Sequence, residues 1–258
     1  MLVAANISVR VGRKQILHDI HFTAAPGAVT AIVGPNGSGK STLLKAMTGD
    51  IGYDGTVHLG GDDVARMHAW QLAARRAVLP QASALAFPFT VIEVVRIGLQ
   101  SGVDAAQDTR ALEALDRVGL AHYAHRFYQE LSGGEQQRAQ LARVLAQVWE
   151  PVRDGVPRWL LLDEPVSALD IAHQLEVMHL ARDYAAQGGG VVAVMHDLNL
   201  TAMFADQVAV LKDGAVLAAG PVEEVFTDDT LGTAYGCQIR VSAAPSASVP
   251  FILPHMAS

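Results

Sequence analysis

A glycine-rich stretch near the N-terminus carries residue types that can hold an anion. Gly34 to Thr42 reads GPNGSGKST and lies between the apolar run Ala28–Val33 and a helix-like run that Gly49 closes. Glycines let the backbone turn its N–H groups inward around an anion, and the dipole of the following helix adds attraction. In the spacing G-x-x-x-x-G-K-S, Lys40 reaches the β- and γ-phosphates of a nucleotide and Ser41 offers a hard oxygen to Mg²⁺. The stretch predicts a nucleotide site made of Gly34, Pro35, Asn36, Gly37, Ser38, Gly39, Lys40, Ser41 and Thr42.

Two adjacent acids stand at the end of a second apolar run. The segment WLLLDEP, Trp159 to Pro165, predicts a buried strand that ends at Asp163 and Glu164. At a strand exit the chain turns, so both carboxylates can face the same crevice. Asp163 would then help to hold Mg²⁺, and Glu164 would orient and deprotonate a water that attacks the γ-phosphate. A solvated acidic turn is the alternative, and the phosphate loop in the same chain makes it the poorer interpretation.

The start of a helix shortly before that strand offers a second place for an anion. In LSGGEQQRAQLARVLAQV, Leu131 to Val148, Ser132 is an N-cap candidate, and Glu135 three residues on completes a capping box. The free N–H groups of the first turn attract anions. An ordinary capped helix would carry the same pattern. The residues alone leave open whether this second site serves the same nucleotide as the first.

The motifs GPNGSGKST, LSGGEQQR, LLLDEP, SALD and VMHDLN occur together and in this order. With this combination the chain resembles the ATP-binding-cassette (ABC) ATPases, the nucleotide-binding subunits of ABC transporters, over nearly its whole length. The resemblance implies an ATP-hydrolysing enzyme that forms a head-to-tail homodimer with ATP buried between the subunits. It also implies that each ATP is held by the phosphate loop of one chain and the signature motif of the other, here Ser132, Gly133, Gly134, Glu135 and Gln136.

The same resemblance assigns roles to residues of further motifs. Gln81, in VLPQ, would touch Mg²⁺ and the attacking water and report the nucleotide state to a transport partner. His196, in VMHDLN, would contact the γ-phosphate and steady the water. Ser167 and Asp170, in SALD, would belong to a loop that links the two sites across the dimer. The implied catalytic residues are therefore Glu164, His196 and Gln81, and the implied Mg²⁺ ligands are Ser41, Gln81 and Asp163.

Two positions depart from the family pattern. One is Val166 in EPVSALD, where a hydroxyl residue is common, and we expect little consequence. Many members carry an aromatic residue before a glycine near the N-terminus, where the ring stacks on adenine. Here the corresponding place reads RVGRK, with Val11 before Gly12. The resemblance therefore leaves open how adenine is held.

Alternating strand and helix patterns predict an α/β fold with a parallel sheet, helices outside it and an antiparallel β layer. In the terms of the resembled family, this is a P-loop NTPase (RecA-like) core with an inserted helical subdomain. We expect the nucleotide-binding core at residues 1–84 and 156–258, and the helical subdomain with the signature motif at 85–155. Together they would form one ABC transporter domain, with an irregular tail from about residue 238.

Composition excludes several other classes of protein. The chain has 258 residues, half of them hydrophobic, which is enough for a sizeable core. Its net charge of −7 disfavours generic binding of nucleic acid. No apolar run reaches the roughly 18–20 residues that span a bilayer, and the N-terminus lacks the order of a secretory signal, so we expect a cytosolic chain. The single cysteine, Cys237, excludes an internal disulfide, and we expect it to be packed.

The transported substrate has to be inferred from resemblance alone. RRAVLPQASALAFPFTVIEVVRIG resembles the ATPases of iron-siderophore, haem and cobalamin importers. Among these, VWEPVRDGVPRWLLLDEP and SALDIAHQ are most similar to the haem (hemin) branch. The resemblance implies haem import through a separate inner-membrane permease, present in two copies, with a periplasmic binding protein acting indirectly and no nucleic acid partner. A ferric-siderophore or cobalamin importer is the alternative.

The place of the chain in the cell follows from the same resemblance. It implies a peripheral subunit on the cytoplasmic face of the bacterial inner membrane. Phe87, Pro88 and Phe89 are candidates for docking the permease, with plain packing of an FPF turn as the alternative.

Two functions of other classes stay open beside the importer. One is a soluble ABC-type ATPase of translation or DNA repair, although such proteins usually carry two cassettes or long heptad arms. The other is a regulator that binds ATP without hydrolysing it, against which the intact Glu164 and His196 argue. Rates of ATP hydrolysis discriminate among them.

Overall fold

The computed structural model describes residues 1–81, 87–101, 108–244, 250 and 252–253. Its centre is a six-stranded sheet in the order β12-β11-β3-β10-β9-β6, where β12 is the antiparallel member at one edge. Every residue of β3, β9 and β10 is buried, as expected for parallel strands covered by helices on both faces. The strands are β3 (Val29–Val33), β6 (Arg76–Leu79), β9 (Trp159–Asp163), β10 (Gly190–Val194), β11 (Gln207–Lys212) and β12 (Ala215–Pro221).

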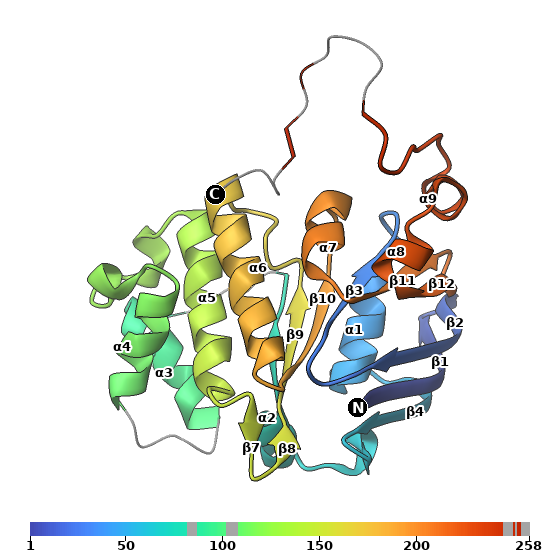
Figure 1. Cartoon of the computed structure of the whole chain (residues 1–258). Helices are drawn as coiled ribbons and strands as arrows, with labels where there is room; N and C mark the ends of the chain where they lie inside the picture. The colour runs from blue at the N-terminus through green and yellow to red at the C-terminus, as the bar shows by residue number, and fades with distance from the viewer. Residues whose placement is uncertain (82–86, 102–107, 245–249, 251, 254–258) are drawn as a thin grey trace.

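A second, antiparallel sheet has the order β2-β1-β4-β5. Helix α1 (Lys40–Thr48) lies between this sheet and the central one (Figure 1), and its Leu43 and Met47 belong to a buried cluster with residues of both sheets. Gly49 ends α1 in the left-handed conformation, at a φ of 74°, as the sequence predicted. The strands of this layer are β1 (Leu2–Val11), β2 (Lys14–Ala24), β4 (Asp54–Leu59) and β5 (Asp62–Asp63).

A group of helices lies beside the edge of the central sheet that ends in β6, on the left of Figure 1. Helices α3 and α5 meet closely, since a Cβ on Gly98 would lie 2.1 Å from the carbonyl oxygen of Arg143. Helix α5 is also tied to the core, because Gln147 Nε2 donates to the carbonyl oxygens of Ala73 at 3.0 Å and Arg76 at 2.9 Å. The helices of this group are α3 (Val91–Ser101), α4 (Asp108–Arg117) and α5 (Gly133–Gln147).

The face of the central sheet opposite α1 is covered by α6 and α7. Leu161 of β9 faces the cluster around α1, whereas its neighbours Leu160 and Leu162 face the cluster that contains α6. Within the described part of the chain, no helix is long and apolar enough to cross a membrane. The remaining elements are α6 (Ile171–Ala186), α7 (Leu198–Phe204), α2 (Ala69–Arg75), α8 (Val222–Val225), α9 (Asp228–Tyr235), the 3-10 helices at Val64–Arg66, Ala121–Tyr123 and Tyr128–Glu130, and the hairpin β7 (Val152–Arg153) with β8 (Val156–Pro157).

This architecture confirms the predicted α/β fold with a mainly parallel sheet, outer helices and an antiparallel layer. The subdomain boundaries 1–84, 85–155 and 156–258 stay predictions. The expectation that Cys237 is packed was wrong: the residue is exposed, because it follows Gly236, where α9 ends in the left-handed conformation. Residues 82–86, between Gln81 and the FPF turn, lie outside the described residues.

Candidate active site

The predicted phosphate loop connects β3 to α1, and two of its glycines are required by their surroundings. Gly34 has a φ of +145°, and a Cβ there would lie 2.1 Å from the carbonyl oxygen of Leu211. Gly39 has a φ of +101°, and a Cβ there would lie 2.6 Å from Cδ2 of Leu17. Only glycine fits both the backbone angle and the space at these positions. The loop therefore lies closely packed between β11 and β2, and this packing fixes its backbone in the absence of a ligand.

The side chain of Lys40, the first residue of α1, folds back over this loop. It is buried, with 5% of its surface exposed, and its Nζ donates to the carbonyl oxygens of Gly34 at 2.9 Å and Pro35 at 3.1 Å. Burial lowers the pKa of Lys40, while the carboxylates of Glu164 and Asp163 oppose this shift. A buried cation whose described hydrogen bonds go to neutral carbonyl oxygens is a strong attractor for a phosphate oxygen.

Ser41 and Asp163 place two oxygen ligands side by side. Ser41 Oγ donates to Oδ1 of Asp163 at 2.9 Å, and Asp163 is buried at the end of β9. Burial raises the pKa of Asp163, which the hydrogen bond from Ser41 partly opposes. A nearby divalent cation would relieve this cost of desolvation. Hydroxyl and carboxylate oxygens in this arrangement fit the preferences of Mg²⁺.

Glu164 is the point where the three predicted catalytic residues meet. Its Oε1 lies 2.6 Å from Nε2 of His196, and its Oε2 accepts from Nε2 of Gln81 at 2.9 Å. The Glu164 side chain is 14% exposed, against 42% for that of His196. The carboxylate is therefore shielded yet reachable from the side of the histidine.

The parallel sheet explains why these side chains come together. Gln81 follows β6, Glu164 follows β9 and His196 follows β10, and these three strands are neighbours in the order β10-β9-β6. The carboxyl ends of parallel strands meet at one edge of a sheet, which is where ligands bind in open α/β folds.

The predicted signature residues begin α5. Ser132 caps the helix, and Oε2 of Glu135 accepts from both the N–H and the hydroxyl of Ser132, each at 2.7 Å. These hydrogen bonds, that from the hydroxyl first, lower the pKa of Glu135. The side chain of Gln136 is held by the segment just before the helix, because its Nε2 donates to the carbonyl oxygens of Tyr128 and Leu131. Among the described hydrogen bonds, none joins Ser132 to the phosphate loop, so one chain does not unite its two predicted anion sites.

The SALD residues lie in the turn after β9 and at the start of α6. Asp170 caps α6, accepting from the N–H of His173 at 3.0 Å and lying 2.8 Å from its Nδ1. The hydrogen bonds from His173, that from its backbone first, lower the pKa of Asp170. Ser167 Oγ donates to the carbonyl oxygen of Glu164 at 3.2 Å. This turn is therefore connected directly to the backbone of the acidic residue.

Sequence reasoning missed Gln137, which bridges α5 and this turn. Its Nε2 donates to the carbonyl oxygen of Glu164 at 2.8 Å, and its Oε1 accepts from the N–H of Ala168 at 3.2 Å. Gln137 stands four residues after Gly133, so the two share a face of α5. That spacing places Gln137 on the side of the helix that carries the signature glycine, which is the signal the sequence offered.

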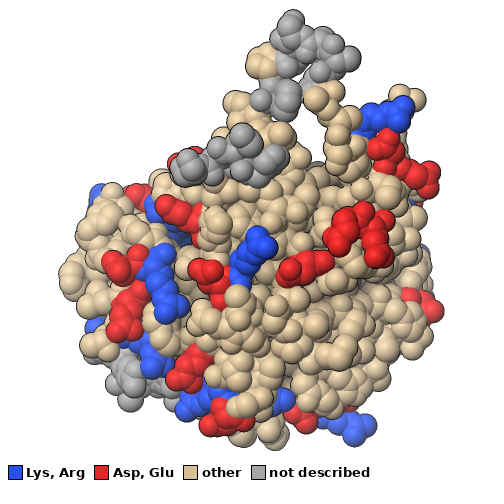
Figure 2. Space-filling view, viewed as in Figure 1, with Lys and Arg blue, Asp and Glu red and all other residues tan. Residues whose placement is uncertain are grey.

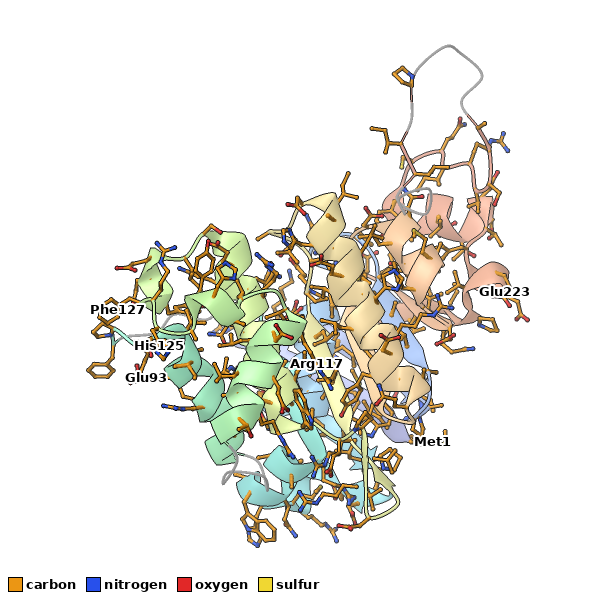
Figure 3. All side chains as sticks on the ribbon, turned by 60° about the vertical axis from the view of Figure 1, so that its left-hand side comes forward. Met1, Glu93, Arg117, His125, Phe127 and Glu223 are labelled. Carbon is orange, nitrogen blue, oxygen red and sulfur yellow. The ribbon has the colours of Figure 1, made fainter. Side chains whose placement is uncertain are left out.

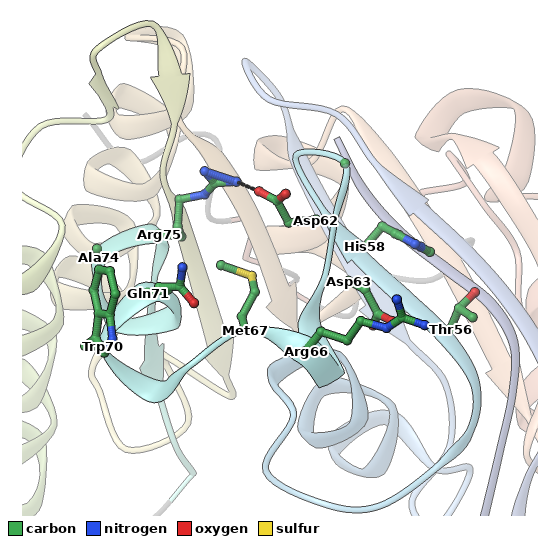
Figure 4. A pocket seen from close by; sticks show the side chains of 11 residues that line it. Thr56, His58, Asp62, Asp63, Arg66, Met67, Trp70, Gln71, Ala74 and Arg75 are labelled. Carbon is green, nitrogen blue, oxygen red and sulfur yellow. Dashed lines mark hydrogen bonds and ion pairs between the residues drawn. The ribbon is translucent and has the colours of Figure 1, made fainter.

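Two hollows help to locate the site. A cavity of about 230 Å³ lies between α5 and the core and is lined by Gln81, Gly133, Gln137 and Ser167 among others. A groove of about 790 Å³ lies elsewhere, between β4, β5 and α2 (Figure 4). None of the predicted site residues lines this groove, and its Arg75 is paired with Asp62 at 2.6 Å. The smaller cavity, not the larger groove, belongs to the candidate active site.

Comparison with known proteins agrees with this geometry. The family model described as "ABC transporter" matches residues 17–167. A protein of Roseobacter denitrificans named "Hemin import ATP-binding protein HmuV" is 65% identical over 100% of this chain and 98% of its own length. The protein of the same name from Rhizobium meliloti is 56% identical over 100% of both chains.

Solved structures show the same fold. The ATP-binding cassette MJ0796, in a dimeric post-hydrolysis state bound to ADP and Pi, superposes with a TM-score of 0.75 at 27% identity, covering 86% of this chain and 99% of that one. A putative metal-chelate type ABC transporter in an inward-facing conformation gives a TM-score of 0.73 at 26% identity, covering 90% and 88%. The chain therefore belongs to the ABC transporter family, as an ATP-binding cassette that hydrolyses ATP.

Proposed function

We propose that this chain is the ATP-hydrolysing subunit that powers import of haem (hemin) through a separate membrane permease. Support for hydrolysis comes from the carboxylate of Glu164, held by Gln81 and His196 at the edge of the sheet next to the phosphate loop. Support for haem comes from the relatives named as hemin import proteins, which match the chain over its whole length at 56% and 65% identity. An importer of ferric siderophores or cobalamin is the alternative.

In the proposed mechanism, Gly34 to Thr42 wrap the phosphates of ATP. Lys40 leaves the carbonyl oxygens of its own loop and pairs with the β- and γ-phosphates, which exchanges neutral partners for anionic ones. Ser41, Asp163 and Gln81 would hold Mg²⁺, which neutralises phosphate charge when it is bound. Their oxygens lie where the loop, β9 and β6 converge.

Glu164 acts as the general base in this proposal. Its carboxylate accepts the proton of a water that attacks the γ-phosphate. His196 contacts the γ-phosphate and steadies the water, and Gln81 contacts the same water. The 2.6 Å contact to His196 and the 2.9 Å bond from Gln81 hold the carboxylate in one orientation before the substrate arrives.

The proposed active unit is a head-to-tail homodimer. The first turn of α5 in one chain, with Ser132, Gly133, Gly134, Glu135 and Gln136, would face the phosphate loop of the other, and Ser132 and Gly133 are exposed. Ser167 and Asp170 lie in the turn that would connect the two sites, and Ser167 is bonded to the backbone of Glu164. For adenine the chain offers no aromatic ring at Val11, which is 63% exposed.

The permease is proposed to dock on the outer end of the helical region. Phe87 is 68% exposed and lies edge-on to Phe89, with ring centroids 6.4 Å apart. Phe127, 49% exposed, lies at the same end of the helical region as Glu93 and His125 in Figure 3. An apolar, aromatic surface of this kind is typical of protein interfaces.

The remaining partners follow from this proposal. The assembly would contain two chains and two copies of the permease, on the cytoplasmic face of the bacterial inner membrane, with a periplasmic binding protein acting through the permease. Nucleic acid is not a proposed partner, and Figure 2 shows acidic and basic side chains interspersed on the viewed face without a continuous basic patch.

The substrate is tested by isolating the chain with its permease in gentle detergent and measuring ATP hydrolysis. Haem-loaded binding protein should stimulate turnover, and siderophore-loaded or cobalamin-loaded binding proteins should not. Stimulation by another chelate alone would overturn haem as the substrate and leave the hydrolytic site intact. A chain that co-purifies with ribosomes or DNA and no membrane protein would favour the soluble alternative.

A further inference from the structure

The turn from Glu164 to Ala168 is held at both ends by one side chain of the helical region. The amide of Gln137 donates from Nε2 to the carbonyl oxygen of Glu164 at 2.8 Å and accepts at Oε1 from the N–H of Ala168 at 3.2 Å. Both hydrogen-bonding groups of the amide are thus used, one at each end of the turn. The arrangement fixes the turn against α5.

The backbone of Glu164 needs such support. Its φ is +54°, in the left-handed region that residues other than glycine seldom adopt and that surrounding contacts must maintain. The N–H of Glu164 donates to the carbonyl oxygen of Val194 at 3.2 Å, which anchors one side. The carbonyl oxygen on the other side accepts from Ser167 Oγ and from Gln137. The direction of the carboxylate depends on this conformation.

Gln137 is the partner of Glu164 that comes from a different part of the fold. Val194 and Ser167 both belong to segments that adjoin the central sheet, whereas Gln137 lies on α5. Helix α5 approaches the turn closely at Gly134, where a Cβ would lie 3.1 Å from the carbonyl oxygen of Ala168. The helix that carries Ser132 at its start is therefore in direct contact with the backbone of the catalytic carboxylate.

We propose that Gln137 is a positioning residue for ATP hydrolysis: its amide holds the turn at residues 164–168, so that the Glu164 carboxylate faces Gln81 and His196 only when α5 is correctly placed against the core. This inference rests on the proposed role of Glu164. The described hydrogen bonds of Gln137 go to the backbone of Glu164 and Ala168 and not to the carboxylate, so Gln137 acts through the backbone. A movement of α5 would thereby change the position of the Glu164 carboxylate in the same chain.

The test removes both hydrogen bonds while keeping the shape of the side chain. In the full-length chain, Gln137→Met should lower kcat about tenfold, as expected for two lost hydrogen bonds, and leave KM for ATP unchanged. The matched control is Gln147→Met, because Gln147 lies on the same helix and also bridges it to the core through two carbonyl oxygens. That variant should lose thermal stability to a similar extent and keep kcat. An unchanged kcat in Gln137→Met would overturn the proposal.

A second variant separates the two hydrogen bonds. Gln137→Glu keeps an acceptor for the N–H of Ala168 but places an oxygen against the carbonyl of Glu164. It should lose at least as much kcat as Gln137→Met, and wild-type turnover would contradict the assignment. It also supplies the answer if the methionine variant does not fold.

A double-mutant cycle shows whether Gln137 works through Glu164. In a Glu164→Gln background, Gln137→Met should cause no further loss of the residual turnover. A further tenfold loss would mean that Gln137 acts independently of the carboxylate, and the inference would fail. Near-normal turnover of Glu164→Gln alone would instead remove the proposed role of Glu164, so the two failures are distinguishable.

Discussion

The N-termini of α1 and α5 are both built to attract an anion, but they differ in completeness. At α1 the loop is wedged between neighbouring strands, and Lys40 brings a buried cation with 5% of its surface exposed. At α5 the first turn is exposed, and Glu135 occupies both the N–H and the hydroxyl of Ser132. We therefore expect the α1 site to bind a nucleotide with the groups of one chain, whereas an anion at α5 would have to displace Glu135 from Ser132.

Because of this difference, we predict different roles for the N-termini of α1 and α5. We expect the loop at α1 to determine the affinity for ATP and the carboxylate of Glu164 to determine the rate of hydrolysis. In the proposed dimer, the start of α5 would act on the nucleotide bound by the second chain. Substitutions in the two regions should therefore separate binding, turnover and dimerisation.

The largest effect is expected at the catalytic carboxylate. Glu164→Gln should slow ATP hydrolysis by about 10²–10⁴-fold, because a general base contributes this much, while ATP still binds and a stable dimer forms. Single-turnover hydrolysis and size-exclusion chromatography with ATP measure both properties. Near-normal turnover would remove Glu164 from the mechanism.

A smaller effect, on the affinity for ATP, is expected at the phosphate loop before α1. Lys40→Ala should weaken ATP binding by about 100-fold, as expected for the loss of hydrogen bonds between a cation and phosphate. Equilibrium titration with a fluorescent ATP analogue measures the Kd. Arg66→Ala, which removes an exposed cation from the groove outside the candidate active site, is the matched control and should keep wild-type affinity.

A substitution at the start of α5 should change turnover and not the affinity for ATP. Ser132→Ala should leave the affinity of the separate chain for ATP unchanged but lower turnover about tenfold, because a hydrogen bond to a charged phosphate is lost across the dimer. Loss of the helix cap should also cost about 1 kcal/mol of stability. Thr227→Ala, which removes the cap of α9, controls for the stability change alone. Equal turnover in the two variants would contradict a role for Ser132 beyond capping.

The smallest effect concerns the cap made by Glu135. The hydrogen bonds from Ser132 lower the pKa of Glu135 in the folded chain. A lowered carboxyl pKa contributes stability above the unfolded pKa of about 4.3, and this contribution is lost as pH falls through the folded pKa. Glu135→Gln should therefore reduce the melting temperature slightly at pH 7, and the difference from the wild type should shrink as the pH falls below the unfolded pKa. Glu113→Gln, at an exposed position on α4, should leave the melting temperature unchanged.

Some features of the site could be predicted from sequence because they rest on local spacing. The strand before Gly34, the capping box of Ser132 and Glu135, and the acids at the end of β9 all appear as expected. The meeting of Gln81, Glu164 and His196 depends on strand order, which only the family resemblance implied. The left-handed backbone of Glu164 arises from tertiary contacts between distant segments, and no local pattern signals it. For its support by Gln137 the sequence offered only the spacing of four residues from Gly133. The prediction that Cys237 is packed was wrong for a similar reason, because the exposure of this residue depends on where α9 ends in the folded chain.

The central claim, that each ATP site needs two chains, can be tested by mixing two variants that are each impaired in ATP hydrolysis. A dimer of one Lys40→Ala chain and one Ser132→Ala chain contains one intact site if the phosphate loop of one chain faces α5 of the other. We predict that an equimolar mixture hydrolyses ATP clearly faster than either variant alone. A mixture no more active than the mean of the two separate variants would contradict the account and place a complete site within each chain.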